Sequence, residues 1–451
     1  MIDKAFHQCF ALTKKTGSVL IYCMIIMLSV LSVVAPGSVS GAESRIQPAL
    51  AIGEEYNDNI FLTSENRSSD FISRVVPAIN FMYKAPLWDW DLNGYYEYRY
   101  YARFHDYVTQ NTIPNLNLAN HTRIKDEYIF LDVNDNYSKT SLDPVRNFTQ
   151  ESAFINQTDK NVLTIVPYFI IRPTLQMTVT TGYTYSNIWY KDPAAIDQVY
   201  NIVYTGFQQD ISKRFNMIGG IKHTQNNNSG LAVSSFTNMN TAATSTVQSY
   251  TQDDVYLGQR YEYVENSVLS VTVGNTWFRI PETQTDAVKR VSQVTWDAYL
   301  TQIYSTMTVT YETGLRFIPD PEKISRREDR YLVTIRRDSG RTSIIAAGGL
   351  LEYRNIVSKH LENSTYLISG TIDHSLSSKS KIILNLEADW YKDYVGSTKT
   401  QRYLSGARFE RLLAEKLTLA LFYNYSHVYS PDVSSSNYFN NRYSVELRMV
   451  F

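Results

Sequence analysis

The chain ends in the sequence Arg-Tyr-Ser-Val-Glu-Leu-Arg-Met-Val-Phe, residues 442–451. The side chains of an extended strand point alternately to its two faces. One face of this stretch is polar and carries Arg442, Ser444, Glu446 and Arg448. The other face is apolar and ends in an aromatic ring; its residues are Tyr443, Val445, Leu447, Met449 and Phe451. Half-buried strands of soluble proteins alternate in the same way, so the surroundings of this strand must be inferred from the rest of the chain.

The first part of the sequence has the organisation of a secretory signal peptide. Basic residues precede an apolar run over residues 19–34, and the small residues Ser40 and Ala42 lie at −3 and −1 of a cleavage site before Glu43. The apolar run, about 16 residues, is shorter than the ~20 that a membrane-spanning helix needs. We therefore predict a cleaved signal peptide over residues 1–42 and one domain after it.

Composition narrows the class of the remaining region, residues 43–451. Both cysteines, Cys9 and Cys23, lie in the predicted signal peptide, so this region has no disulfide and no cysteine-ligated metal. A net charge of −1 gives no basic field for binding nucleic acid. The mean hydropathy of −0.28 is too low for a bundle of membrane helices, but it suits a barrel with a polar lumen, as do the 35 tyrosines.

Apolar and polar side chains alternate through this region in segments of about 12 residues, separated by turn residues. In a membrane barrel the apolar row faces lipid and the polar row faces the lumen. One apolar row is Met307, Val309, Tyr311, Leu315 and Phe317. The same alternation predicts ten charged residues on lumenal faces: Asp89, Asp91, Glu97, Arg99, Lys381, Glu387, Asp389, Arg408, Glu446 and Arg448.

The connections between these segments alternate between short and long, the pattern of short periplasmic turns and longer extracellular loops. They predict an all-β fold: a transmembrane antiparallel β-barrel of about 20 strands, or about 18 if the weakest first strand, residues 46–62, is discounted. Both ends of the barrel are expected on the periplasmic side. The polar loops 141–159 and 225–246 are candidates for a plug or constriction, although the second also suits a solvated surface loop.

A soluble sandwich or propeller is the alternative fold. Against it stand the absence of a repeat period and a strand length well above the usual ~5–6 residues of soluble sheets. The terminal stretch ending in Phe451 also resembles the C-terminal signature of bacterial outer-membrane barrels. That resemblance implies a location in the outer membrane, contact with outer-membrane lipid and lipopolysaccharide, and insertion by the barrel-assembly machinery.

No pattern in the sequence predicts a catalytic, cofactor-binding or metal site. The six histidines after the signal peptide form no catalytic or metal-binding motif; they are His105, His121, His223, His360, His374 and His427. Carboxylates spaced i, i+2 on one face, such as Asp89 with Asp91 and Glu387 with Asp389, could form an acid–base pair. Because arginines and lysines share the same faces, an ion-pair ladder along the lumen wall is the preferred interpretation.

Oxygen-rich clusters occur at the predicted outer ends of two strands, at residues 57–59 and 134–136. Such clusters can hold Ca²⁺, but neither has the spacing of a calcium-binding loop. Asn and Asp are also favoured where a strand turns. We therefore expect turns here and no metal.

The residues after the signal peptide resemble a known family. The run Glu55, Tyr56, Asn57, Asp58, Asn59, Ile60 and Phe61 is similar to the opening strand of the outer-membrane barrel proteins associated with PEP-CTERM/exosortase exopolysaccharide loci. The resemblance spans residues 43–451 and implies a tyrosine-rich barrel linked to exopolysaccharide production or surface export. It implies no catalytic residue and no cofactor.

Three functions are compatible with the sequence. The first is a transport or scaffold barrel that works with exopolysaccharide or with components of an export system. The second is a general diffusion porin, which predicts a constriction lined by charges of one sign. The third is a barrel enzyme acting on lipid or glycan, which predicts a convergent catalytic site. A receptor with an N-terminal plug is not expected, because strands begin within a few residues of the predicted cleavage site.

Overall fold

The computed structural model describes residues 42–451 except 109–110, 126, 143–151, 153–154, 194, 230, 234–243, 247–248, 282–287 and 321–324. Residues 1–41 of the predicted signal peptide lie outside the described residues. Much of the two loops predicted as a plug or constriction lies outside them too. In the described part of the chain, no helix is long and apolar enough to cross a membrane.

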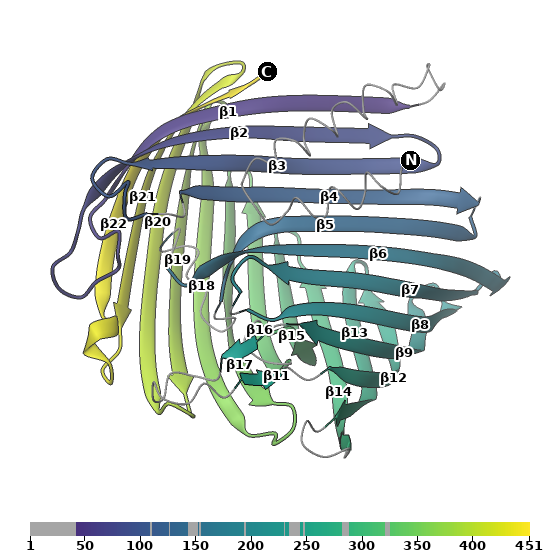
Figure 1. Ribbon diagram of the computed structural model, residues 1–451. Coiled ribbons are helices and arrows are strands. Elements are labelled where there is room, and N and C mark those ends of the chain that lie inside the picture. Colours follow the sequence, from purple (N-terminus) through teal and green to yellow (C-terminus); the bar gives the residue numbers. More distant parts are fainter. Residues whose placement is uncertain are drawn as a thin grey trace, which may run out of the picture.

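Within the described residues, twenty antiparallel strands form one sheet that closes on itself (Figure 1). The sheet closes where β1 pairs with β22, from Ala49 opposite Val450 to Asn57 opposite Arg442. Two further short strands, β10 and β11, form a separate hairpin. The predicted all-β barrel and its strand count of twenty are confirmed, and the smaller count of eighteen is wrong.

The strands run in sequence order around the barrel, and Figure 1 shows β1 to β9 along one side and β17 to β22 along another. Their bounds are β1 Glu43–Asn57, β2 Asp70–Lys84, β3 Trp88–Tyr101, β4 Thr112–Lys125, β5 Ile129–Ser141, β6 Gln157–Thr174, β7 Met177–Tyr190, β8 Asp197–Ser212, β9 Phe215–Ser229, β10 Leu231–Val233, β11 Thr244–Thr246, β12 Tyr250–Val264, β13 Ser267–Pro281, β14 Val288–Ile303, β15 Met307–Ile318, β16 Arg326–Ser339, β17 Thr342–Asn355, β18 Leu361–Ser377, β19 Ser380–Asp393, β20 Thr398–Ala414, β21 Leu417–Tyr429 and β22 Tyr438–Val450. A 3₁₀ turn, η1 Ser434–Ser436, precedes β22.

The outer face of the barrel is apolar and exposed. On β22 the five residues of the apolar row, from Tyr443 to Phe451, are all exposed, whereas Glu446 of the opposite row is buried. On β19 Leu386 is 65% exposed. A continuous apolar outer face is stable only against an apolar solvent, so the wall of this barrel is suited to a lipid bilayer.

The short turns lie at one end of the barrel, as the sequence predicted. The turn between β16 and β17, for example, contains Gly340 with φ +55°, a conformation that glycine adopts without steric cost. Glu43, the first residue of β1, pairs with Lys84 beside another short turn. β1 itself ends at Asn57 and does not continue to Leu62, because the Asn57 side chain accepts the Asn59 backbone N–H (2.9 Å) and turns the chain.

Within the part of the chain that the structure describes, the wall is split between β14 and β15. These strands pair only from Asp297 opposite Gly314 to Ile303 opposite Thr308, although β13 and β16 pair with them along much of their lengths. Beyond Gly314, the end of β15 turns inside the barrel. Phe317 lies on the row predicted to face lipid, but its ring packs at 4.7 Å against the ring of Phe278, which points inward from β13.

The prediction that Leu315 and Phe317 face lipid is therefore wrong. Leu315 is only 6% exposed, and Phe317 packs against a buried apolar cluster. The physical reason is the loss of pairing with β14, which allows the outer end of β15 to leave the cylinder and cover its apolar row against the inner face of its neighbours.

Candidate functional site

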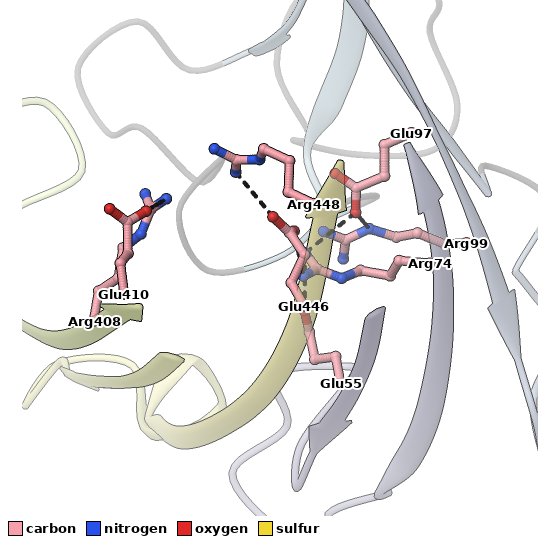
Figure 2. A network of polar contacts seen from close by, with 8 residues as sticks. All are labelled: Glu55, Arg74, Glu97, Arg99, Arg408, Glu410, Glu446 and Arg448. Carbon is pink, nitrogen blue, oxygen red and sulfur yellow. Dashed lines mark hydrogen bonds and ion pairs between the residues drawn. The ribbon is translucent and has the colours of Figure 1, made fainter. Parts of the chain in front are cut away.

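A network of charged side chains lies on the lumenal face where the barrel closes (Figure 2). Its centre is Arg74 of β2, whose guanidinium lies 3.3 Å from Glu446 of β22, 3.6 Å from Glu97 of β3 and 3.9 Å from Glu55 of β1. Arg99 pairs with Glu97 at 2.7 Å and Arg448 with Glu446 at 2.9 Å, each within its own strand. We call these six residues the seam network: Glu55, Arg74, Glu97, Arg99, Glu446 and Arg448.

Gly53 of β1 explains how Arg74 reaches across a strand. It lies opposite Arg74 on one side and opposite Glu446 on the other. A Cβ atom at this position would come within 2.6 Å of the Val445 carbonyl oxygen. Because glycine has no side chain, Arg74 and Glu446 can meet above β1. The seam network thus joins four neighbouring strands by charge as well as by backbone hydrogen bonds.

The remaining charges predicted on the lumenal face occupy two other regions. On β19, Lys381 pairs with Glu410 at 2.9 Å, and Glu387 and Asp389 both contact Arg402 of β20. Arg408 pairs with Glu410 in its own strand, apart from the seam network in Figure 2. Asp89 and Asp91 of β3 line a separate hollow of about 300 Å³.

That hollow contains a feature that the sequence did not predict. His121 of β4 and Asp132 of β5 line it and lie 2.6 Å apart. A His–Asp pair can support a nucleophile, but no serine, threonine or cysteine lines this hollow. Among the described residues, no group of three or more His, Cys, Asp or Glu is placed to hold a metal ion. In this hollow, therefore, the His–Asp pair has no nucleophile beside it.

The family-like run at residues 55–61 connects the start of the barrel to its last strand. Glu55 belongs to the seam network. Tyr56 packs beside Phe71 and Tyr443, at ring distances of 5.1 and 6.5 Å. Ile60 is 2% exposed, and Phe61 packs edge-on against Phe104.

The polar residues of the same run bind the first part of β22. The Asp58 carboxylate accepts the Asn441 backbone N–H at 2.7 Å and its side-chain amide at 2.8 Å. The Asn59 side-chain amide donates to the Phe439 carbonyl oxygen at 3.0 Å. We call Asp58, Asn59 and Asn441 the seam latch, because they add side-chain bonds where the first and last strands meet.

Replacing Asp58 by alanine is expected to lower the free energy of unfolding by about 1–3 kcal/mol, because the partly buried donors of Asn441 lose a charged acceptor. Urea unfolding of the barrel in lipid vesicles measures the change. Asp106→Ala is the matched control, since the Asp106 side chain is 82% exposed. Equal unfolding midpoints for the two variants would show that the seam latch adds no stability.

The inward-turned ends of β15, β16 and β17 form a second feature of the lumen, which we call the collar (residues 315–318, 326–330 and 351–357). Arg327 of the collar donates to the Gln293 side chain of β14 at 3.1 Å. Gln293 in turn donates to the Ile356 carbonyl oxygen at 2.8 Å. The loop after β15 reaches β8, where the Gln198 amide donates to the Asp320 carbonyl oxygen at 2.9 Å.

An apolar cluster fixes the collar against the barrel wall. Phe278 and Val291 point inward from β13 and β14, and Phe317 and Ile356 of the collar pack with them. Burial of such side chains is the main stabilising contribution available at this end of the barrel. The contacts extend from β14 to β8, so the collar covers the inner face of several neighbouring strands and narrows the lumen.

A cavity of about 460 Å³ lies between the collar and the inner faces of β8, β9, β12 and β13. We call it the collar cavity. A second cavity of about 530 Å³ lies on the opposite part of the wall, among polar residues of β18 to β21 such as Asn385, Glu387 and Asn424. The collar cavity is the more aromatic of the two: five aromatic side chains line it (Tyr200, Tyr250, Tyr256, Trp296 and Phe317), whereas the second cavity has Tyr425 alone.

Comparisons with known proteins support the fold alone. No protein-family model matches the sequence, and no curated protein matches it. The structure is similar to the FrpB iron transporter from Neisseria meningitidis (F5-1 variant), with a TM-score of 0.50 and 8% identity over 92% of this chain and 83% of that one. It is similar to the copper transporter OprC, with a TM-score of 0.50 and 8% identity over 92% and 81% of the two chains. These similarities show the fold, a closed antiparallel β-barrel of the kind found in outer-membrane proteins.

Proposed function

We propose that this protein is an outer-membrane transport barrel that gives a neutral, hydrophilic polymer a passage to the cell surface, as part of exopolysaccharide production or surface export. The observation that carries the proposal is the pairing of lumenal charges. Glu446, Lys381 and Arg402 each lie beside a charge of opposite sign. A wall with paired charges exerts little net field on an uncharged chain that passes it.

The link to exopolysaccharide rests on the resemblance at residues 55–61. The apolar outer face supports a location in the outer membrane, and the exposed terminal row ending at Phe451 supports recognition by the barrel-assembly machinery. A signal peptide over residues 1–42 would direct the chain there.

A general diffusion porin is the second candidate. It shares the barrel and the polar lumen, but it predicts a constriction with charges of one sign. In the described residues, the collar holds both Arg327 and Asp329, which pair at 2.9 Å. An enzyme is disfavoured, because the pair formed by His121 and Asp132 has no serine, threonine or cysteine in the hollow that it lines.

Single-channel recording in a planar bilayer tests the proposal. The full-length precursor gene is expressed and the barrel is purified from the outer membrane. We expect stable current steps that fall when the neutral exopolysaccharide of the same cells is added on the periplasmic side. Polygalacturonate of similar length serves as the charged control and should reduce the current less. A sealed bilayer with folded protein would contradict a transport function, and current that no polymer reduces would favour the porin.

A further inference from the structure

The collar cavity has the size of a small-molecule site. Its volume of about 460 Å³ lies within the range of roughly 300–1,000 Å³ that such sites occupy. It is built on the inner faces of rigid strands and closed on one side by the collar residues Leu315, Arg316 and Phe317. The residues that line it therefore hold fixed positions before a ligand arrives.

The charged groups of the collar cavity are already paired. Four charged side chains line it: Lys222, Asp254, Asp297 and Arg316. Their ion pairs are Lys222 with Asp254 at 3.0 Å, Arg316 with Glu328 at 2.5 Å, and Asp297 with Arg330 at 3.3 Å. An ionic ligand would have to displace one member of an ion pair, and the displaced charge would then have no neighbour of opposite sign. The cavity therefore favours an uncharged ligand.

Aromatic rings provide the largest apolar surfaces of the cavity. Tyr200 of β8, Tyr250 and Tyr256 of β12, and Phe317 of the collar line it. Tyr256 is 37% exposed, so part of its ring is open to a ligand, whereas Tyr250 is buried. Aromatic faces select flat apolar surfaces, and the tyrosine hydroxyls add polar groups at their edges.

Buried polar atoms in the same wall have no partner. Thr224 of β9 lines the cavity and is 4% exposed, and its Oγ1 atom has no hydrogen-bond partner within the described part of the chain. In the next lumenal position, Asn226 is fully buried between Tyr200 and Tyr250, and neither end of its amide is paired there. A buried hydroxyl without a partner costs free energy that a ligand hydroxyl can recover.

From the paired charges, the aromatic surfaces and the unpaired Thr224 hydroxyl, we infer that the collar cavity is a binding subsite for a neutral sugar ring of a saccharide chain. A pyranose carries no charge, has an apolar face of C–H groups that can lie on the Tyr256 ring, and has hydroxyls that can bond to Thr224. A metal ion or a phosphate would lack these contacts. The inference rests on the proposed transport of a neutral polymer, and it assigns one place in the lumen where that polymer is held.

Isothermal titration calorimetry with neutral hexasaccharides tests the subsite. The full barrel is kept in lauryldimethylamine oxide, which has no sugar headgroup, and maltohexaose, cellohexaose and chitohexaose are the probes. We expect at least one probe to bind. Tyr256→Ala should weaken this binding about tenfold, and Thr224→Val, which keeps the shape and removes the hydroxyl, about fivefold.

Tyr95→Ala is the matched control. Tyr95 is a lumenal tyrosine of β3 with 40% exposure, close to that of Tyr256, and it lies outside the collar cavity. This variant should bind the probe as the unchanged protein does. Equal binding by the Tyr95, Tyr256 and Thr224 variants would overturn the subsite, as would the failure of all three probes to bind folded barrel.

Two further outcomes identify a different ligand. Tighter binding of hexagalacturonate than of any neutral probe would overturn the choice of a neutral sugar, and so would displacement of the probe by decanoate. Current recordings on the same preparation separate this inference from the proposed function. If the exopolysaccharide still reduces the current while Tyr256→Ala leaves sugar binding unchanged, the subsite is wrong and polymer transport stands. If no current flows, transport is wrong whatever binds in the cavity.

Discussion

Replacing Arg74 by methionine is expected to lower the free energy of unfolding of the barrel by about 3 kcal/mol. Arg74 makes the ion pairs of the seam network that join different strands, whereas Arg99 and Arg448 pair with carboxylates of their own strands. Its side chain is 12% exposed, and the three carboxylates around it are similarly buried. Without Arg74 these negative charges remain close together in a poorly solvated place.

Urea unfolding in lipid vesicles, followed by tryptophan fluorescence, measures this loss. Arg74→Lys keeps the charge but not the forked guanidinium, so its unfolding midpoint should lie between those of the methionine variant and the unchanged protein. Arg336→Met is the control, because Arg336 forms a 2.8 Å pair with Asp338 in which both side chains are more than half exposed. That exposed pair should contribute little. If Arg74→Met unfolds at the unchanged midpoint, the seam network does not hold the barrel closed.

Sequence alone predicted the architecture well because a membrane barrel repeats one simple pattern. Apolar and polar side chains alternate along each strand, and turn residues mark each short turn. The same rule therefore predicted β22 from residues 442–451 and the strands next to it from their own sequences. The end of β1 was predicted five residues too far along the chain, because the apolar residues Ile60 and Leu62 fall on the same row as Ile52 and Tyr56. There the Asn57 side chain bonds to the backbone and turns the chain, and alternation does not report such local bonds.

The collar could not be predicted in the same way. The row from Met307 to Phe317 is apolar at every position except Thr313, although pairing with β14 stops at Gly314. One signal was present in the neighbouring strands. On the row of β16 that carries Tyr331 and Val333, the next residues outward are Asp329 and Arg327, and charges on a lipid-facing row show that the lipid environment has ended.

The ion-pair partners within the seam network could not be predicted from the sequence either. Alternation placed Glu97, Arg99 and Glu446 on one face, but it could not choose their partners, because strands far apart in sequence meet only when the barrel closes. Arg74 and Glu446 are 372 residues apart. Gly53, which lets them meet, has no side chain, so the alternation of apolar and polar residues does not single it out.

Replacing Phe278 by alanine is expected to release the collar and to increase the single-channel conductance of the barrel. Phe278 is 1% exposed and packs against Phe317 at 4.7 Å and Tyr250 at 5.7 Å. Loss of a buried phenylalanine ring costs about 3–5 kcal/mol. Because the collar is held by this cluster and a few hydrogen bonds, the loss should appear as local opening at the outer end, with the sheet below intact.

Planar-bilayer recording of the purified barrel checks this expectation, and Phe422→Ala is the control. Phe422 also points into the lumen, where it lies under Arg408 at 4.8 Å, but it does not touch the collar. Removal of the Phe422 ring should enlarge the lumen only by the volume of that ring. Arg327→Met provides a second route to the same state, since it removes the bond from the collar to Gln293, together with the ion pair to Asp329, without creating a cavity. If Phe278→Ala and Arg327→Met both conduct like Phe422→Ala, the collar does not limit the passage, and the narrowest point of the lumen lies elsewhere.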